Sequence, residues 1–164
     1  MKTLRQLMVV GLGTLLVVTG AYAEELMLNF RNVQQKADDT MHSQSEDKST
    51  GAGTYRTQGL TFLEDGTVAT YVSQGAFSYS GKGSWHTGYS VRTYPDGSTT
   101  TGHFTGQSRE GTAPLEMEWE GTAQYVDGTG RFEGATGTGT YVGGRYANGM
   151  SVTEVEAKFT LAEQ

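Results

Sequence analysis

Hydrophobic and polar residues alternate along most of the chain after residue 53. Between residues 115 and 120 every odd position is apolar and every even position is glutamate. Successive side chains of a β-strand point to opposite faces, so this pattern predicts a strand with one buried and one solvated face. The predicted buried face carries Leu115, Met117, Trp119, Ala123 and Tyr125. Near the C-terminus the same alternation predicts a buried face made of Val155, Ala157, Phe159 and Leu161.

Four Asp-Gly or Asn-Gly pairs divide this region, at residues 65–66, 96–97, 127–128 and 148–149. Such pairs favour hairpin turns, because both residues tolerate the positive φ that these turns require. For Asn148-Gly149 we expect a two-residue turn that sets Val142 opposite Val155. The pattern predicts strands near residues 25–32, 53–63, 67–79, 83–94, 98–108, 115–126, 137–147 and 150–162.

Strands of this length separated by short turns predict an all-β protein, an antiparallel up-and-down barrel of about eight strands. Closure of the barrel removes exposed strand edges, and an open sandwich is the competing arrangement. Residues 34–50 are polar and have no sustained period, so we expect a long loop or a short frayed helix there. The domain plan is a signal peptide at 1–23, a first strand and polar loop at 24–52, and the barrel at 53–164.

The first 23 residues have the three parts of a secretory signal peptide. Two basic residues precede an apolar core at 7–18, and Ala21 and Ala23 then supply small residues at the two positions that a signal peptidase reads. The apolar core is shorter than the roughly 20 residues that a membrane-spanning helix needs. We therefore expect cleavage between Ala23 and Glu24, a periplasmic or secreted location, and no stable membrane anchor. N-terminal sequencing of the exported protein would then begin at Glu24.

The composition argues against several classes of binding partner and functional site. The chain has no cysteine, which excludes disulfides, a cysteine nucleophile and a lipid anchor attached through cysteine. Cleavage would leave 141 residues and change the net charge from −6 to −8. An acidic chain without a basic cluster predicts no nucleic-acid partner. The composition is compatible with a homo-oligomer.

The turn at Pro95-Asp96-Gly97 predicts the register of one hairpin. If it pairs Tyr94 with Ser98, then Tyr89 lies opposite His103 and Trp85 lies opposite Gln107. The face that carries Trp85, Tyr89 and Val91 has the larger aromatic area, so we expect it to point inward. His103 would then lie in the interior beside a tyrosine hydroxyl, and it is the one candidate for a reactive group.

The three histidines do not predict a metal site. His42 falls in the polar segment, and the register places His86 and His103 on opposite faces of the hairpin. We expect no metal and no cofactor, and no residue is assigned a catalytic role. The candidate ligand-binding residues are the aromatic and histidine side chains predicted to face inward: Trp85, Tyr89, His103, Trp119 and Tyr125.

Residues 128–137 read Gly-Thr-Gly-Arg-Phe-Glu-Gly-Ala-Thr-Gly. This segment resembles the allene oxide cyclase family and, more loosely, the dirigent proteins that share its barrel. The resemblance implies an eight-stranded barrel with an apolar lumen, in which reactive intermediates are guided chiefly by shape. The four glycines indicate a tight turn, a bulge and close backbone approach, and Phe132 is expected to plug one end of the barrel.

Two hypotheses of function follow. In the first, the lumen binds a small apolar molecule, with or without shape-guided cyclisation or isomerisation. In the second, the barrel is filled by its own side chains, and the protein is a non-catalytic exported module that acts through its surface. An open cavity of about 300 Å³ or more would favour the first hypothesis.

Overall fold

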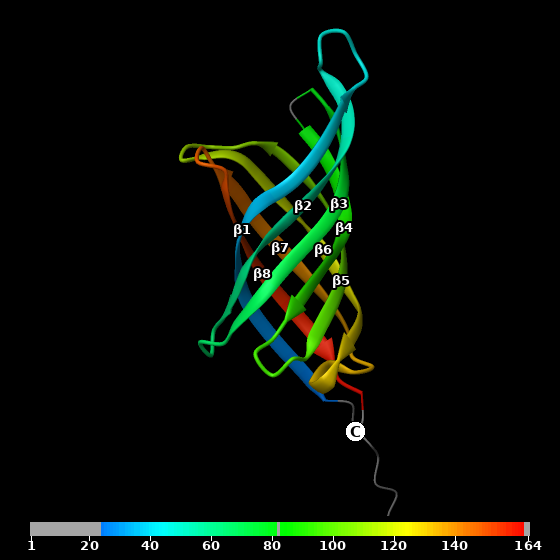
Figure 1. Cartoon of the computed structure of the whole chain (residues 1–164), viewed down its shortest axis with the longest axis vertical. Helices are drawn as coiled ribbons and strands as arrows, with labels where there is room; N and C mark the ends of the chain where they lie inside the picture. The colour runs from blue at the N-terminus through cyan, green and yellow to red at the C-terminus, as the bar shows by residue number, and fades with distance from the viewer. Residues whose placement is uncertain (1–23, 82, 163–164) are drawn as a thin grey trace, which may run out of the picture.

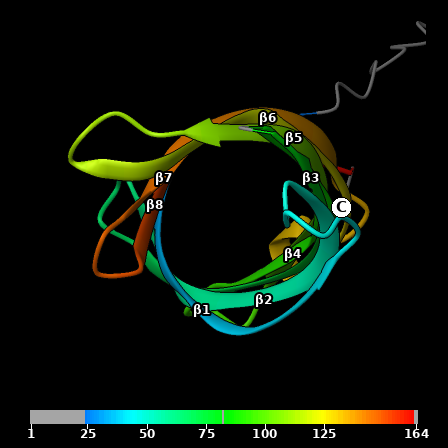
Figure 2. The same cartoon turned by 90° about the horizontal axis from the view of Figure 1, so that it is seen from above.

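The segments of alternating residues form a closed antiparallel barrel (Figure 1, Figure 2). The computed structural model describes residues 24–81 and 83–162, so the predicted signal peptide lies outside the described residues. Each strand pairs with the next one in sequence, and the last strand pairs with the first, which confirms the predicted up-and-down barrel. The strands are β1 (Glu25–Ser43), β2 (Thr50–Leu63), β3 (Val68–Ser80), β4 (Gly83–Thr93), β5 (Thr99–Glu110), β6 (Leu115–Thr129), β7 (Thr136–Tyr146) and β8 (Met150–Thr160).

The described residues contain one short 3-10 helix, Gly130–Phe132, between β6 and β7. No helix in the described part of the chain has the length and hydrophobicity that crossing a membrane requires.

Three of the four predicted turns share one geometry. In each, the glycine N–H donates to the carbonyl three residues earlier: Gly66 to Leu63, Gly97 to Tyr94 and Gly149 to Tyr146. The Asp or Asn side chain before the glycine accepts a hydrogen bond from the backbone two residues after itself. All three glycines have φ of +83° or +84°. The turn chemistry of the sequence is therefore confirmed at these three places.

The Asn148-Gly149 turn differs from the prediction by one residue. The loop contains three residues rather than two, because Gly149 takes the positive-φ bulge position after a turn that begins at Tyr146. Val155 consequently pairs with Tyr141, and Val142 pairs with Glu154. The predicted pairing of Val142 with Val155 is wrong.

The Asp127-Gly128 pair forms no hairpin. β6 continues through it to Thr129 and stays paired with β5, with Gly128 opposite Thr100. The register shifts just before the pair, where Val126 is an extra residue on β6. The pair therefore marks the end of a β-bulge, and its Asp side chain accepts the N–H of Gly128.

Replacing Gly149 by valine should lower the free energy of unfolding by about 1–3 kcal/mol. A Cβ at this position would contact nothing within 4 Å, so the cost comes from the backbone conformation at φ +83°. Asparagine tolerates this conformation better than valine does, so Gly149→Asn should cost less. Urea unfolding of both variants measures the difference. Equal losses would show that the turn does not depend on positive φ.

The first strand is much longer than the sequence predicted. β1 continues through the polar segment to Ser43, which corrects the expected loop or frayed helix at residues 34–50. Its last residues pair only with β2, because pairing with β8 ends at Gln35. This part of the β1–β2 hairpin projects beyond the barrel, as Figure 1 shows at the top of the view. Both of its faces are solvated, which explains why no hydrophobic period is present.

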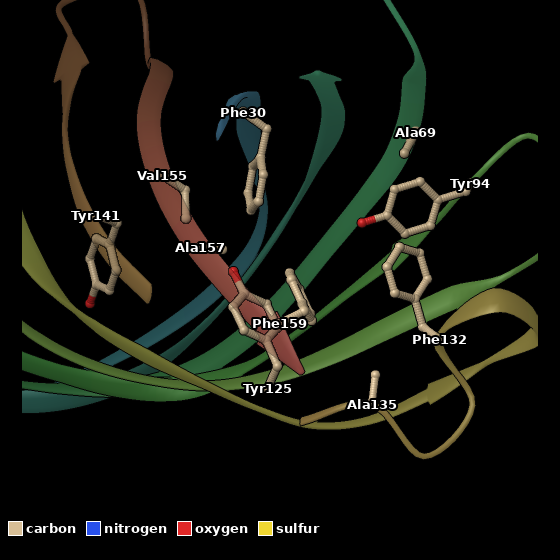
Figure 3. Packing of buried hydrophobic residues seen from close by; sticks show 10 residues of the cluster. All are labelled: Phe30, Ala69, Tyr94, Tyr125, Phe132, Ala135, Tyr141, Val155, Ala157 and Phe159. Atoms are coloured by element: carbon tan, nitrogen blue, oxygen red, sulfur yellow. The ribbon is translucent and has the colours of Figure 1, made fainter. Parts of the chain in front are cut away.

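The opposite end of the barrel is closed by packed aromatic rings (Figure 3). Phe132 and Phe159 are each 1% exposed, and their ring centroids are 5.6 Å apart. Tyr94 packs against Phe132 at 4.9 Å, and Tyr125 packs against Phe159 at 4.4 Å. The prediction that Phe132 plugs one end is confirmed. We call this group of four rings the floor of the barrel.

Glycines of the segment 128–137 shape the floor as predicted. Gly130 and Gly134 have φ of +60° and +68°. A Cβ at Gly128 would lie 2.5 Å from the carbonyl oxygen of Phe132, and one at Gly137 would lie 2.5 Å from that of Lys158. These glycines allow the chain to turn under the barrel and bring Phe132 into its end.

Candidate functional site

The hairpin of β4 and β5 has the predicted register but the opposite orientation. Tyr89 pairs with His103 and Trp85 pairs with Gln107, as expected. However, Trp85 is 68% exposed and Tyr89 is 58% exposed, so their face is the outer surface of the barrel. The prediction that Trp85, Tyr89 and Val91 point into the lumen is wrong. The alternate residues of β4, from Ser84 to Arg92, point inward instead.

His103 therefore lies on the outside of the barrel. Its ring packs against Tyr89, with 5.0 Å between the ring centroids, and its Nε2 atom is 3.1 Å from the hydroxyl of Thr87. The expectation that His103 is a lumen group, and with it the candidate reactive role, is wrong. His86 is the histidine that faces the interior.

The predicted orientation of the β4–β5 hairpin was wrong because the interior of the barrel is not uniformly apolar. The inward positions of β4 carry small or polar residues, because large side chains from other strands lie across them. Aromatic area on a single hairpin is therefore a poor guide to orientation in a barrel with an open lumen.

The other two candidate residues do line the interior. Trp119 lies on the inward face of β6, and its Nε1 atom donates to the hydroxyl of Thr153 at 3.2 Å. Tyr125 is 3% exposed and belongs to the floor, where it packs against Phe159. The alternation of β6 is thus confirmed from Met117 onward, with Glu118 and Glu120 outside, where Glu118 pairs with Arg109 at 3.0 Å.

The lumen holds a cavity of about 1150 Å³. It opens at the end of the barrel that bears the β1–β2 hairpin and the β7–β8 turn, since residues of both line it. The floor closes the other end. The wall combines aromatic rings with many polar side chains; the aromatic lining residues are Tyr55, Tyr71, Phe77, Tyr79, Phe104, Trp119, Tyr125 and Tyr141.

A row of four paired residues crosses the wall at mid-height: His86, Gly106, Gly121 and Tyr141 are neighbours across β4, β5, β6 and β7. The His86 and Tyr141 side chains lie over the two glycines and meet, with 2.8 Å between His86 Nε2 and the Tyr141 hydroxyl. A Cβ on either glycine would lie 2.3 Å from that hydroxyl. Glycine at both positions is therefore what makes room for the histidine–tyrosine hydrogen bond.

A second row repeats this arrangement on the neighbouring strands. Tyr55, Gly75, Gly88 and Phe104 are paired in order across β2, β3, β4 and β5. A Cβ on Gly75 would lie 2.9 Å from the Tyr55 hydroxyl, and one on Gly88 would lie 2.8 Å from the tip of the Phe104 ring. In both rows the rings lie along the wall instead of pointing across the lumen, which keeps the cavity open.

Burial sets the protonation of the mid-height pair. It lowers the pKa of His86 below its usual value of 6.5 and raises the pKa of Tyr141. At neutral pH both groups are therefore uncharged, and each is able to donate or accept one hydrogen bond. A ligand in the lumen would meet a neutral base and a neutral hydroxyl already joined to each other.

The lowered pKa of His86 predicts how stability depends on pH. Below about pH 6.5 the unfolded chain binds a proton at this histidine more readily than the folded chain does, so acid favours unfolding. The loss of stability between about pH 7.5 and pH 5.5 should therefore be smaller in His86→Gln than in the wild type. His103→Gln, on the outer face, is the matched control and should keep the wild-type loss. Urea unfolding at both pH values tests this; identical losses in all three proteins would contradict it.

Arg92 is the charged group deep in the lumen. It lies on β4, six residues beyond His86 toward the floor, and is 3% exposed. Its guanidinium group stands over the rings of Phe30 and Tyr71, at 4.1 Å and 5.1 Å from their centroids. Arg92, His86 and Tyr141 were not predicted from the sequence as site residues. The sequence feature that could have indicated the inward face is the presence of glycines at alternate positions of neighbouring strands.

No group of three or more metal-binding side chains occurs in residues 24–81 and 83–162. The site consists of an aromatic wall, a neutral histidine–tyrosine pair and one buried cation. These groups can hold an organic molecule and exchange hydrogen bonds with it.

The sequence matches no protein family profile and no curated protein. Solved structures do share the fold. A conserved protein of unknown function from Rhodopseudomonas palustris aligns with a TM-score of 0.56 at 12% identity, over 84% of this chain and 99% of its own. The pterocarpan synthase dirigent protein PsPTS1 aligns with a TM-score of 0.50 at 12% identity, over 88% and 99%. The barrel implied by the dirigent resemblance is confirmed, and at this identity the likeness concerns the fold alone.

Proposed function

We propose that this protein binds a small, largely apolar molecule in the lumen of its barrel. The observation that carries the proposal is the cavity of about 1150 Å³ between the floor and the open end. Ligand pockets typically measure about 300–1000 Å³ and combine an apolar lining with a few placed polar groups. The lumen has this character, and its size argues against the alternative of a barrel filled by its own side chains.

A shape-guided isomerisation or cyclisation is the second candidate function. It is favoured by the His86–Tyr141 hydrogen bond, because both residues line the lumen. A neutral histidine is able to take a proton from a bound molecule, and the tyrosine hydroxyl is able to stabilise a developing negative charge on oxygen. If such a reaction occurs, His86→Phe should abolish it, whereas His103→Phe on the outer face should not.

The predicted signal peptide supports a site of action in the periplasm or outside the cell. A surface role would use the outer face, where a shallow depression of about 960 Å³ is lined in part by the exposed Trp85. The two roles can be separated by experiment, since the chain has two tryptophans, one on each face.

The test uses N-phenyl-1-naphthylamine, a neutral apolar dye whose fluorescence rises when it enters an apolar site. The wild-type protein should bind the dye, and 1-decanol should displace it. Two single-tryptophan variants then locate the site. In Trp85→Phe the remaining Trp119 lies in the lumen, so its emission should shift when 1-decanol binds. In Trp119→Phe the remaining Trp85 lies outside, and its emission should stay constant.

A response from Trp85 without one from Trp119 would place binding on the outer surface and overturn the lumen proposal. Absence of dye binding would also overturn it. If Trp119 responds as expected, native mass spectrometry of protein purified from its own host would identify the natural ligand through a co-purifying small molecule.

A further inference from the structure

We infer that the lumen selects an organic anion, a molecule with one negatively charged group such as a carboxylate at the end of an apolar body. The inference rests on the proposed function, because it requires that the lumen bind a ligand. It adds the charge of that ligand and the direction in which it lies. The residue that recognises the charge is Arg92.

Arg92 is a buried cation without a counterion. No ion pair to it occurs within residues 24–81 and 83–162, and its Nε and Nη1 atoms have no hydrogen-bond partner there. An arginine keeps its positive charge throughout the pH range in which proteins fold. Burying such a charge is costly unless it is paired, so buried charges in proteins are nearly always paired. An anionic ligand would supply the missing partner.

The aromatic rings around Arg92 fix its position but do not complete its hydrogen bonding. Phe30, Tyr71 and Tyr125 have ring centroids 4.1, 5.1 and 5.9 Å from the guanidinium carbon. Cation–π contacts offset part of the desolvation of the charge. They leave the N–H groups of Nε and Nη1 without acceptors, so the guanidinium group is held in place beside the cavity.

A second unsatisfied group lies next to the first. Thr100 pairs directly with Arg92 across β4 and β5, is 1% exposed, and its hydroxyl has no partner either. More than nine in ten buried polar groups in native proteins are hydrogen-bonded, so two such residues side by side are unusual. A carboxylate has two oxygens that accept hydrogen bonds, and it would complement both residues.

The charges that line the cavity are arranged by depth. At the open end the lining carries charges of both signs, and some of them pair with each other, as Lys36 does with Asp39 and Arg145 with Glu116. Arg92 is the charged residue of the inner part. Because Arg92 is only 3% exposed, its charge is screened less by solvent than the exposed charges at the open end are.

The geometry also gives the orientation of the ligand. The six residue steps of β4 from Arg92 to His86 span roughly 20 Å along the strand. An elongated anion with its charged end at Arg92 would extend along the aromatic wall toward the His86–Tyr141 pair and the open end. The apolar body of the ligand would occupy the space between the two polar sites.

The experiment compares three ligands with the same ten-carbon chain and different charge: decanoate, 1-decanol and decyltrimethylammonium. Each is titrated at about pH 7.5 against wild-type protein that carries N-phenyl-1-naphthylamine, and displacement of the dye gives the dissociation constant. Decanoate should bind at least tenfold more tightly than 1-decanol, as expected for hydrogen bonds to a buried charge. Decyltrimethylammonium should bind most weakly.

The variants assign the preference to one residue. Arg92→Met replaces the charge by an apolar chain of similar length and should reduce the decanoate preference to near one while dye binding persists. Arg31→Met is the matched control. Arg31 lies on the outer face and pairs with Glu154, so its loss should leave the tenfold preference intact.

The outcomes separate the two proposals. If the dye does not bind to the wild type, the lumen-binding proposal fails. If the dye binds and decanoate displaces it no better than 1-decanol, the proposed function stands and the anion inference is wrong. The three-ligand comparison uses only the wild type, so the inference is decided even if Arg92→Met does not fold.

Discussion

Replacing Phe159 by alanine should lower the free energy of unfolding by about 3–5 kcal/mol. The side chain is 1% exposed and packs between Tyr125 and Phe132 in the floor of the barrel. Its removal would lose the buried area and leave a hole that the surrounding strands, fixed by pairing on both sides, cannot fill. A domain of this size has only about 5–15 kcal/mol of stability in total, so the variant should be marginally folded.

Phe62→Ala is the matched control for this prediction. Phe62 lies on β2 and is 42% exposed, so much of its ring is in contact with water in the folded protein. Its replacement should cost far less. The measurement is urea unfolding followed by far-ultraviolet circular dichroism. Comparable losses at the two positions would show that the floor is not the main source of packing energy.

Replacing Gly121 by alanine should lower the free energy of unfolding by about 1–3 kcal/mol and separate His86 from Tyr141. The added Cβ would lie 2.2 Å from the carbonyl oxygen of Thr105 and 2.3 Å from the Tyr141 hydroxyl. The tyrosine ring would have to leave the wall and point across the lumen. The dye N-phenyl-1-naphthylamine should therefore bind more weakly to this variant than to the wild type.

Gly83→Ala separates this effect from the general cost or benefit of removing a glycine from a strand. Gly83 is exposed at the start of β4, and the nearest atom to a Cβ there would be 3.7 Å away, an ordinary contact. Its replacement should leave stability nearly unchanged and dye binding intact. If Gly121→Ala behaves in the same way, the glycine rows do not hold the lumen open.

The sequence predicts the orientation of a strand well where one face is apolar and the other is charged. On β6 and β8 one face is apolar and the other charged, so burial is decided by hydrophobicity alone, and both orientations were correct. On β4 both faces mix large and polar residues. Trp85 and Tyr89 lie on one face and His86 and Arg92 on the other, and the choice depends on side chains contributed by distant strands. No rule that considers one hairpin by itself contains that information.

Turns and strand ends were also predicted only in part. An Asp-Gly or Asn-Gly pair predicts that the backbone enters the left-handed region, and this was correct at Gly66, Gly97 and Gly149. It does not distinguish a two-residue loop from a three-residue loop, or a turn from a bulge such as the one before Gly128. The projecting end of β1 was missed because hydrogen bonding to β2 forms it without burying an apolar face.

The candidate site was predicted in part for the same reason. Trp119 and Tyr125 were found because the alternation of β6 is clear, whereas Arg92 depends on the closure of the barrel. Its contacts with Phe30 and Tyr71 bring together residues that are far apart along the chain. Arg92 is inside because the closed barrel places the rings of Phe30, Tyr71 and Tyr125 around it.

The closed floor has a kinetic consequence. Since Tyr94, Phe132 and Phe159 seal one end, every molecule that enters the lumen must leave by the opening through which it came. A second molecule cannot push the first out from behind, and exchange requires complete departure before the next arrival. The dissociation rate of one occupant would then set the upper limit on how often the barrel is refilled, whatever the concentration outside.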